Sequence, residues 1–191
     1  GLTAASTATE KKGLGAVVAA LGDRNVLIVL LQGFSSGLPL ALTGATLSIW
    51  LTQSGVSLKA IGFATLIGIA YIFKFLWAPL VDRLPLGPIT RRLGRRRGWA
   101  VVTQFGLMLA ILALGLTDPA RDAATTAAVA VVIAFLSATQ DIVIDAYRIE
   151  LLNSDEQGAG AGTTQVGYRL GMILAGAGAT ALSDYYSWTL I

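Results

Sequence analysis

The sequence contains no cysteine and no histidine among its 191 residues. Without cysteine the chain has no disulfide bond and no reactive thiol, and without both residue types it lacks the ligands of ordinary zinc sites. Ser-His-Asp and Cys-His catalytic groups are excluded for the same reason. We therefore expect no metal site, no cofactor and no enzymatic activity.

Charged residues are also scarce, since they make up 13% of the chain while 54% is hydrophobic. A soluble domain of this size carries about 25% charge. Together with a mean hydropathy of +0.69, the deficit indicates a membrane protein. The net charge of +3 does not indicate nucleic-acid binding, because the positive excess is concentrated in one short loop between apolar runs, where membrane orientation explains it.

Five apolar runs approach or exceed the about 20 residues that cross a bilayer as a helix. They cover residues 26–51, 56–81, 99–116, 123–150 and 159–182, and a sixth begins at 188. Residues 1–22 are small and polar and predict a flexible cytosolic lead, so that 23–191 form the transmembrane bundle. Because the chain lacks an initiator methionine and stops in an apolar run, we expect it to be part of a longer protein.

The connecting loops differ sharply in positive charge. Residues 82–98 hold six arginines, and the amino-terminal lead and the 148–157 loop carry further basic residues. The loops on the opposite side hold only Lys59 and Arg121. The positive-inside rule therefore predicts that the amino terminus and the two basic loops face the cytosol.

Four ionisable side chains lie within the apolar runs, namely Lys74, Asp141, Asp145 and Arg169. A charge near the bilayer centre costs about 2.5–3.5 kcal/mol on insertion scales and is functional by default. Two positive and two negative groups cancel, which is typical of a polar pathway and indicates transport. Lys74, Asp141 and Arg169, with Gln32, lie about 10–17 Å from the cytosolic helix ends at 1.5 Å per residue, so we expect them to line one cavity.

The fourth span concentrates the acidic groups, because Asp141 and Asp145 are four residues apart and Arg148 continues the same helix face. A buried carboxylate beside a base is poised to take up and release a proton. We interpret Asp141 as a proton or substrate site, and the alternative is an ion pair that only holds helices together. Asp145 and Arg148 lie nearer the interface, where we favour the structural role, and we expect Glu150 to be solvated.

Other polar and small residues give weaker predictions. Tyr168 and Arg169 form a donor-rich stripe suited to carboxylates or sugar hydroxyls, whereas Gln104 is expected only to pack. The tryptophans near the span ends predict interfacial anchors: Trp50, Trp77, Trp99 and Trp188. Two glycine pairs fit close helix approach, Gly33 with Gly37 and Gly158 with Gly162, and the alternative is the ordinary glycine content of membrane helices. Gly33, Gly37 and Pro39 could also loosen the first span, although we do not favour this.

The loop after the second span resembles the Gly-x-x-x-Asp-Arg-x-Gly-Arg-Arg signature of the major facilitator superfamily. Residues 78–83 read Ala-Pro-Leu-Val-Asp-Arg, and 94–97 read Gly-Arg-Arg-Arg. Alanine replaces the leading glycine, residues 84–93 are inserted, and the Arg-x-x-Gln-Gly pattern of the proton antiporters is missing. The signature loop consists of Asp82, Arg83, Gly94, Arg95, Arg96 and Arg97, and the resemblance implies that its charged members form a cytosolic latch.

Longer segments resemble the muropeptide permease (AmpG-type) family and its acetyl-CoA transporter relatives, over almost the whole chain after residue 22. They are residues 33–39, 73–83, 94–99, 138–148 and 167–171, and the most specific is Gln-Asp-Ile-Val-Ile-Asp-Ala-Tyr at 140–147. The resemblance implies proton-driven import of N-acetylglucosamine-anhydro-N-acetylmuramyl peptides across a bacterial inner membrane for cell-wall recycling. It also implies the amino-terminal half of a twelve-helix bundle, whose site is completed by the carboxy-terminal half.

The resemblance places Gln140, Asp141 and Asp145 in the substrate or proton site. Muropeptides carry carboxylates, hydroxyls and amides, which the other candidate side chains match: Gln32, Lys74, Tyr168 and Arg169. A transporter of another anion, such as an acyl-CoA or a drug, satisfies the same set. A non-transporting membrane scaffold whose charges only hold helices together is the alternative from another class.

Overall fold

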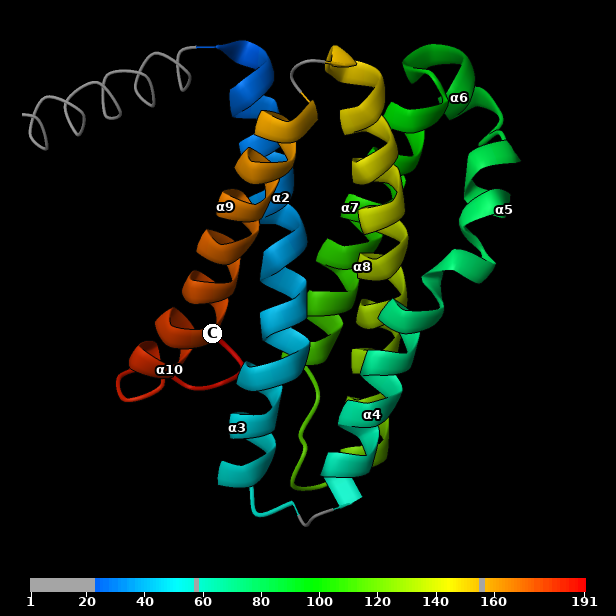
Figure 1. The fold of residues 1–191 in the computed structure, drawn as a ribbon. Helices are drawn as coiled ribbons and strands as arrows, with labels where there is room; N and C mark the ends of the chain where they lie inside the picture. The colour runs from blue at the N-terminus through cyan, green and yellow to red at the C-terminus, as the bar shows by residue number, and fades with distance from the viewer. Residues whose placement is uncertain (1–22, 57–58, 155–156) are drawn as a thin grey trace, which may run out of the picture.

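Helices account for most of the described chain, which comprises residues 23–56, 59–154 and 157–191 of the computed structural model, without the side chains of 59–65 (Figure 1). The predicted all-α fold is confirmed across these residues. The predicted cytosolic lead, 1–22, lies outside them. Three helical stretches are long and apolar enough to cross a membrane: Arg24–Gln53, Arg95–Gly115 and Ala123–Leu151.

The first helical rod consists of α2 (Arg24–Ala41), a π-helical turn η1 (Leu42–Thr46) and α3 (Leu47–Gln53). Asp23 caps α2 by accepting a hydrogen bond from the backbone N–H of Asn25 at 2.8 Å. Helix α2 stays α-helical through Pro39, so no break occurs at the glycines. The wider turn follows the proline, and there the Thr43 hydroxyl donates to the Pro39 carbonyl at 2.8 Å.

The second apolar run is interrupted where a single span was predicted. It forms α4 (Lys59–Ile72), a 3₁₀ turn η2 (Phe73–Leu76) and α5 (Ala78–Arg83). Pro79 occupies the first turn of α5, where its missing N–H costs little. The interruption places Lys74 on the 3₁₀ turn rather than within a continuous helix.

The remaining elements complete the bundle around α8. They are α6 (Pro88–Leu93), α7 (Arg95–Gly115), α8 (Ala123–Leu151), α9 (Gln157–Ile173), the π-helical turn η4 (Leu174–Gly178) and α10 (Ala179–Leu182). Asp122 caps α8 through the backbone N–H and hydroxyl of Thr125, and these two hydrogen bonds lower the pKa of its carboxyl. Residues 188–191, predicted to start a sixth helix, form a turn in which the backbone N–H groups of Leu190 and Ile191 both donate to the Ser187 carbonyl.

Helices α2 and α9 lie side by side in Figure 1 and approach closely through glycine. A Cβ atom on Gly33 or Gly37 would overlap the backbone of α9, and one on Gly167 or Gly171 would overlap the backbone of α2. The close approach predicted for the first glycine pair is therefore observed. The prediction is wrong for the pair at 158 and 162, because a Cβ atom there would meet nothing within 4 Å.

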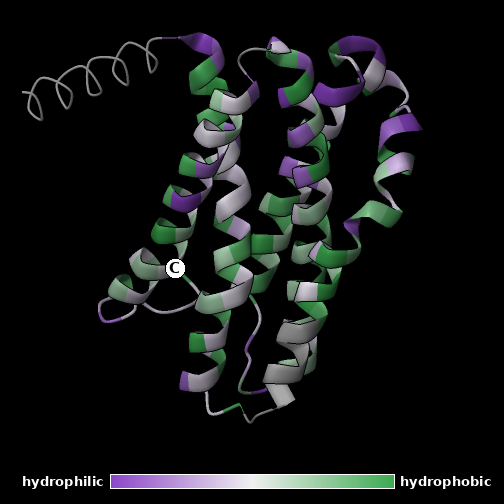
Figure 2. Ribbon diagram, in the orientation of Figure 1, coloured by the Kyte–Doolittle hydropathy of each residue, from purple (hydrophilic) through white to green (hydrophobic). Residues whose placement is uncertain are grey.

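The segments predicted to share the cytosolic side lie at one end of the bundle. Figure 1 shows the start of α2, helix α6, the end of α8 and the start of α9 at this end, opposite the end of α3, the start of α4 and the α7–α8 connection. Figure 2 shows hydrophilic residues gathered around the same end, while apolar residues predominate in the middle. A hydrophobic core near the other end includes Trp50, which is only 9% exposed, so Trp50 is not an interfacial anchor.

Candidate functional site: a charged and polar cluster between helices

Lys74 of the 3₁₀ turn η2 and Asp141 of α8 form an ion pair. The Lys74 Nζ lies 3.7 Å from the Asp141 Oδ2, and their side chains are 35% and 14% exposed. Each charge reduces the cost of burying the other, but only when both partners are present. The pair therefore connects η2 to α8, and the gain or loss of one proton changes the net charge of the pair.

One oxygen of this carboxylate is left without a partner. The Asp141 Oδ1 is buried and accepts no hydrogen bond within the described residues, although Ser36 of α2 lies close enough to interact with the carboxylate. Buried acceptors are nearly always satisfied. An unpaired carboxylate oxygen inside the bundle is therefore positioned to receive a proton or a donor group of a ligand.

Two tyrosines lie near the Asp141 carboxylate. Tyr71 of α4 and Tyr168 of α9 both interact electrostatically with Asp141, and Tyr71 also interacts with Ser137 of α8. The Tyr71 hydroxyl oxygen is buried. Residues from α2, α4, α8 and α9 thus converge on Asp141. The sequence indicated Tyr168 but not Tyr71, which reads as an ordinary aromatic residue in an apolar run.

A second polar group lies between α2, α7 and α8. The Gln140 Nε2 donates to the Ser35 Oγ at 2.9 Å and to the Gln104 Oε1 at 2.8 Å, and the Ser35 hydroxyl donates to the same Gln104 oxygen at 2.8 Å. The expectation that Gln104 only packs is therefore wrong. Its amide joins three helices, because α2 and α8 bring donors to a residue that is isolated in the sequence of α7.

These amides open onto a hollow of about 550 Å³ between α2 and α7, lined by Gln32, Ser35, Gln104 and Gln140 among apolar side chains. The Oε1 atoms of Gln32 and Gln140 are buried without a partner in the described chain. The structure therefore divides the predicted site. Gln32 and Gln140 line this hollow, whereas Lys74 and Asp141 are not among its lining residues.

Arg169 and Asp145 do not join Asp141 in an ion pair. Arg169 is exposed and makes no hydrogen bond or ion pair with another described residue, so its predicted place in one cavity with Lys74 and Asp141 is not observed. The Asp145 carboxylate is 53% exposed and lies 3.6 Å from the Arg148 guanidinium one helical turn away.

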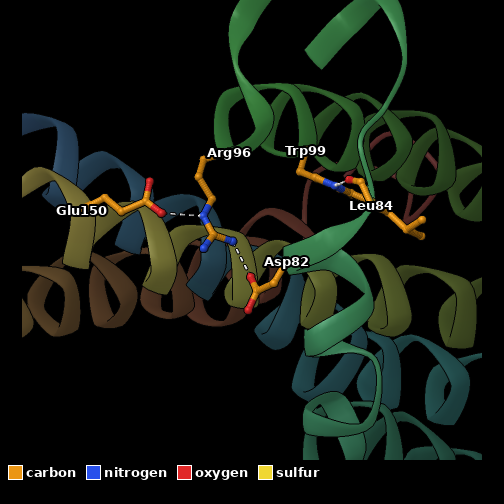
Figure 3. Close-up of polar contacts among 5 residues, drawn as sticks. All are labelled: Asp82, Leu84, Arg96, Trp99 and Glu150. Carbon is orange, nitrogen blue, oxygen red and sulfur yellow. Dashed lines mark hydrogen bonds and ion pairs between the residues drawn. The ribbon is translucent and has the colours of Figure 1, made fainter. Parts of the chain in front are cut away.

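The signature loop is held by one arginine (Figure 3). The Arg96 guanidinium on α7 donates to the Asp82 carboxylate on α5 and to the Glu150 carboxylate on α8, the latter at 2.9 Å. The expectation that Glu150 is only solvated is wrong, although its side chain is 53% exposed. The remaining charged residues of the signature loop are exposed: Arg83, Arg95 and Arg97.

Indole groups also make specific contacts in this part of the molecule. The Trp77 Nε1 donates to the Thr139 Oγ1 at 3.1 Å, and its ring lies 4.8 Å from that of Phe135. The Trp99 Nε1 donates to the Leu84 carbonyl at 3.0 Å (Figure 3). Trp77 and Trp99 thus fix the two ends of α5 to neighbouring helices.

Known proteins resemble this chain over most of its length. A protein family described as Acetyl-coenzyme A transporter 1 matches residues 25–185. A protein of Escherichia coli (strain K12) named anhydromuropeptide permease is 52% identical over 157 residues, which are 82% of this chain and 31% of that protein. An uncharacterized protein of Haemophilus influenzae is 40% identical over 168 residues, 88% of this chain and 39% of that protein.

The chain therefore spans about a third of the length of the curated relatives it matches. The names given to the family and to the Escherichia coli relative belong to proteins that move solutes, not to enzymes. With its apolar helices, the chain is part of a multi-pass membrane protein.

Proposed function

Because this chain belongs to the family described as Acetyl-coenzyme A transporter 1, we propose that it is the amino-terminal part of a proton-coupled transporter that imports muropeptides. The relative named anhydromuropeptide permease, at 52% identity, supports this substrate class. The cargo is N-acetylglucosamine-anhydro-N-acetylmuramic acid with or without its peptide. The protein resides in the bacterial inner membrane with its amino terminus in the cytosol, in accord with the distribution of its arginines.

The observation that carries the proposal is the Lys74–Asp141 pair with its unpaired carboxylate oxygen. Protonation of Asp141 removes the negative charge that holds the Lys74 ammonium. The ammonium is then available to a carboxylate of the cargo, while the neutral carboxyl group can donate a hydrogen bond. Proton uptake and anion binding therefore favour each other, which is the requirement for coupled transport in the same direction.

The other side chains near the pair suit the rest of a muropeptide. Tyr71 and Tyr168 offer hydroxyl groups beside Asp141, and the exposed Arg169 offers a second cation. In transporters built from two bundles the site lies at their interface, so the carboxy-terminal half of the protein supplies the facing wall. The driving force is the proton gradient, and no cofactor takes part.

The family description favours one second candidate, an acyl-CoA such as acetyl-CoA. Its phosphates satisfy Lys74 as a muropeptide carboxylate does, but it lacks the sugar hydroxyls. Competition during uptake separates the two: excess unlabelled anhydromuropeptide abolishes uptake of labelled anhydromuropeptide, whereas excess acetyl-CoA leaves it unchanged.

The proposal is tested by Asp141→Asn in the intact protein. We expect uptake of labelled anhydromuropeptide by cells to fall to the level seen with a protonophore, because the side chain can no longer exchange a proton. Asp118→Asn is the matched control, since Asp118 is exposed and its carboxylate contacts Arg121 and the Ala120 backbone N–H at the opposite end of the bundle. Equal amounts of each variant in the membrane must be shown by immunoblotting.

Unchanged accumulation in Asp141→Asn would remove this residue from the coupling mechanism. Absence of uptake by the wild-type protein, when it is present in the membrane, would exclude muropeptides as cargo. A scaffold that transports nothing predicts that second outcome for every solute tested.

A further inference from the structure

The ten residues inserted into the signature loop form a folded element. Residues 88–93 of the insertion are the helix α6, and the preceding turn is closed by the backbone N–H of Leu86, which donates to the Thr90 Oγ1 at 2.6 Å. Its first residue, Leu84, is held by the Trp99 indole (Figure 3). Ile89 packs against the buried Gly98 of α7. The insertion is therefore fixed to the start of α7 rather than extended in solvent.

This element carries positive charge without internal counterions. Arg96 occupies the two nearby carboxylates, Asp82 and Glu150. The other arginines of the loop are exposed and make no hydrogen bond or ion pair with another described residue: Arg83, Arg91, Arg92, Arg95 and Arg97. The positive-inside rule requires only that such charges be present on one side. It does not explain why they are displayed on a folded surface.

Apolar side chains alternate with these arginines. Leu84, Ile89 and Leu93 are 43%, 39% and 45% exposed. Further along α7, the exposed apolar surface begins with Val101 and Phe105. At 1.5 Å per residue, Arg95 lies about 9 Å beyond Val101 along the helix axis. The arginines thus occupy the level of the lipid headgroups when the apolar surface of α7 lies at the level of the acyl chains.

A hollow of about 270 Å³ lies among these charges, lined by Arg95, Arg96 and Arg97 of α7 with Tyr147 and Glu150 of α8. The Glu150 carboxylate in this hollow is engaged by Arg96. Guanidinium groups match phosphate oxygens in charge and geometry and bind them through paired hydrogen bonds. A membrane-bound phosphate, rather than a soluble one, also satisfies the exposed leucines and isoleucine that lie between the arginines.

We propose that residues 83–97 bind the headgroups of anionic phospholipids, such as phosphatidylglycerol, in the leaflet at this end of the bundle. The arginines bind the phosphates, and Leu84, Ile89 and Leu93 enter the boundary between headgroups and acyl chains. Because α5 and α7 are both joined to this loop, a bound lipid fixes the position of α5, the segment that follows Lys74. The inference depends on the loop alone and not on the identity of the cargo.

The test uses the intact protein purified in detergent and native mass spectrometry with added phosphatidylglycerol or phosphatidylcholine. We expect the wild-type protein to bind phosphatidylglycerol preferentially. The double variant Arg91→Gln/Arg92→Gln should weaken this binding about 30-fold, since each basic residue near a lipid surface contributes a factor of about five. Arg91→Lys/Arg92→Lys keeps the charge and should retain most of the preference, and Arg121→Gln, which removes one positive charge at the opposite end, should retain all of it.

The inference is overturned if the Arg91→Gln/Arg92→Gln protein binds phosphatidylglycerol as the wild type does, or if Arg121→Gln weakens binding equally. It is also overturned if inorganic phosphate, at the concentration of the lipid, displaces phosphatidylglycerol, because the loop is then a site for small anions. Thermal unfolding of each variant without lipid identifies a folding defect. If the double glutamine variant is unfolded, Leu93→Ser is used in its place and should weaken phosphatidylglycerol binding.

Discussion

Single residues within the bundle hold their positions only through their partners. Lys74 lies on a 3₁₀ turn and Asp141 on α8, and their charges meet at 3.7 Å. Removing one partner leaves the other charge partly buried and unpaired, whereas removing both leaves only packing to be restored. The pair can therefore be tested for its contribution to stability separately from any contribution to transport.

We predict that Lys74→Met lowers the thermal unfolding midpoint of the intact protein more than the double variant Lys74→Met/Asp141→Asn does. The loss should stay below the about 3–5 kcal/mol of a fully buried pair, because 35% of the Lys74 side chain is exposed. Tryptophan fluorescence in detergent provides the midpoint. Equal midpoints for the single and double variants would show that the two charges do not stabilise each other.

At the scale of elements, α2 and α9 form a seam in which four glycines let the two backbones touch. Membrane helices gain little from the hydrophobic effect when they associate, so close packing of small residues is a main source of their affinity. The seam fixes α2, which carries Ser35 and Ser36, against the helix that carries Tyr168. It therefore determines which side of α2 faces Asp141.

We predict that Gly37→Ala and Gly167→Ala each destabilise the intact protein, because the added Cβ would overlap the backbone of the facing helix and overpacking costs about 1–3 kcal/mol. Gly68→Ala is the control, since a Cβ there meets nothing within 4 Å and alanine favours a helix by up to about 1 kcal/mol. The thermal unfolding midpoint is measured for all three. A lower midpoint for Gly68→Ala of the same size would exclude the steric explanation.

The helices could be predicted from the sequence because long apolar runs have few other solutions in a bilayer. Depth along each helix was also enough to place Lys74 near Asp141. Depth does not say which way a side chain faces, so it could not show that Arg169 is exposed and forms no ion pair with Asp141. The partners of Gln104 were unpredictable for a related reason: the hydroxyl of its neighbour Thr103 bonds back within α7, and the donors to Gln104 come from α2 and α8.

At the scale of the whole molecule, charge separates one end of the bundle from the other. The loop with six arginines, the start of α2, the end of α8 and the start of α9 share an end (Figure 1), as the positive-inside rule requires of loops on one side. The rule predicts that this end faces the cytosol. Because the chain contains no cysteine, single introduced cysteines can report the side of each loop.

We predict that Pro85→Cys reacts with a membrane-impermeant maleimide only after cells are permeabilised, whereas Ala120→Cys reacts in intact cells. Both positions are exposed, so access to the reagent depends on the side of the membrane. The intact protein is prepared without other cysteines, and labelling is read on gels. Reaction of Pro85→Cys in intact cells would reverse the assigned orientation.

The glycine contacts between α2 and α9 also affect the order in which the helices assemble during synthesis. Gly37 and its contact at Tyr168 are about 130 residues apart in the chain, so at about 5–20 residues per second helix α2 waits on the order of ten seconds for α9 to leave the ribosome. During that interval the face of α2 that bears Gly33 and Gly37 has no α9 to cover it. Helix α2 is thus complete well before its contacts with α9 can form, and its glycine face stays without that partner until synthesis has reached α9.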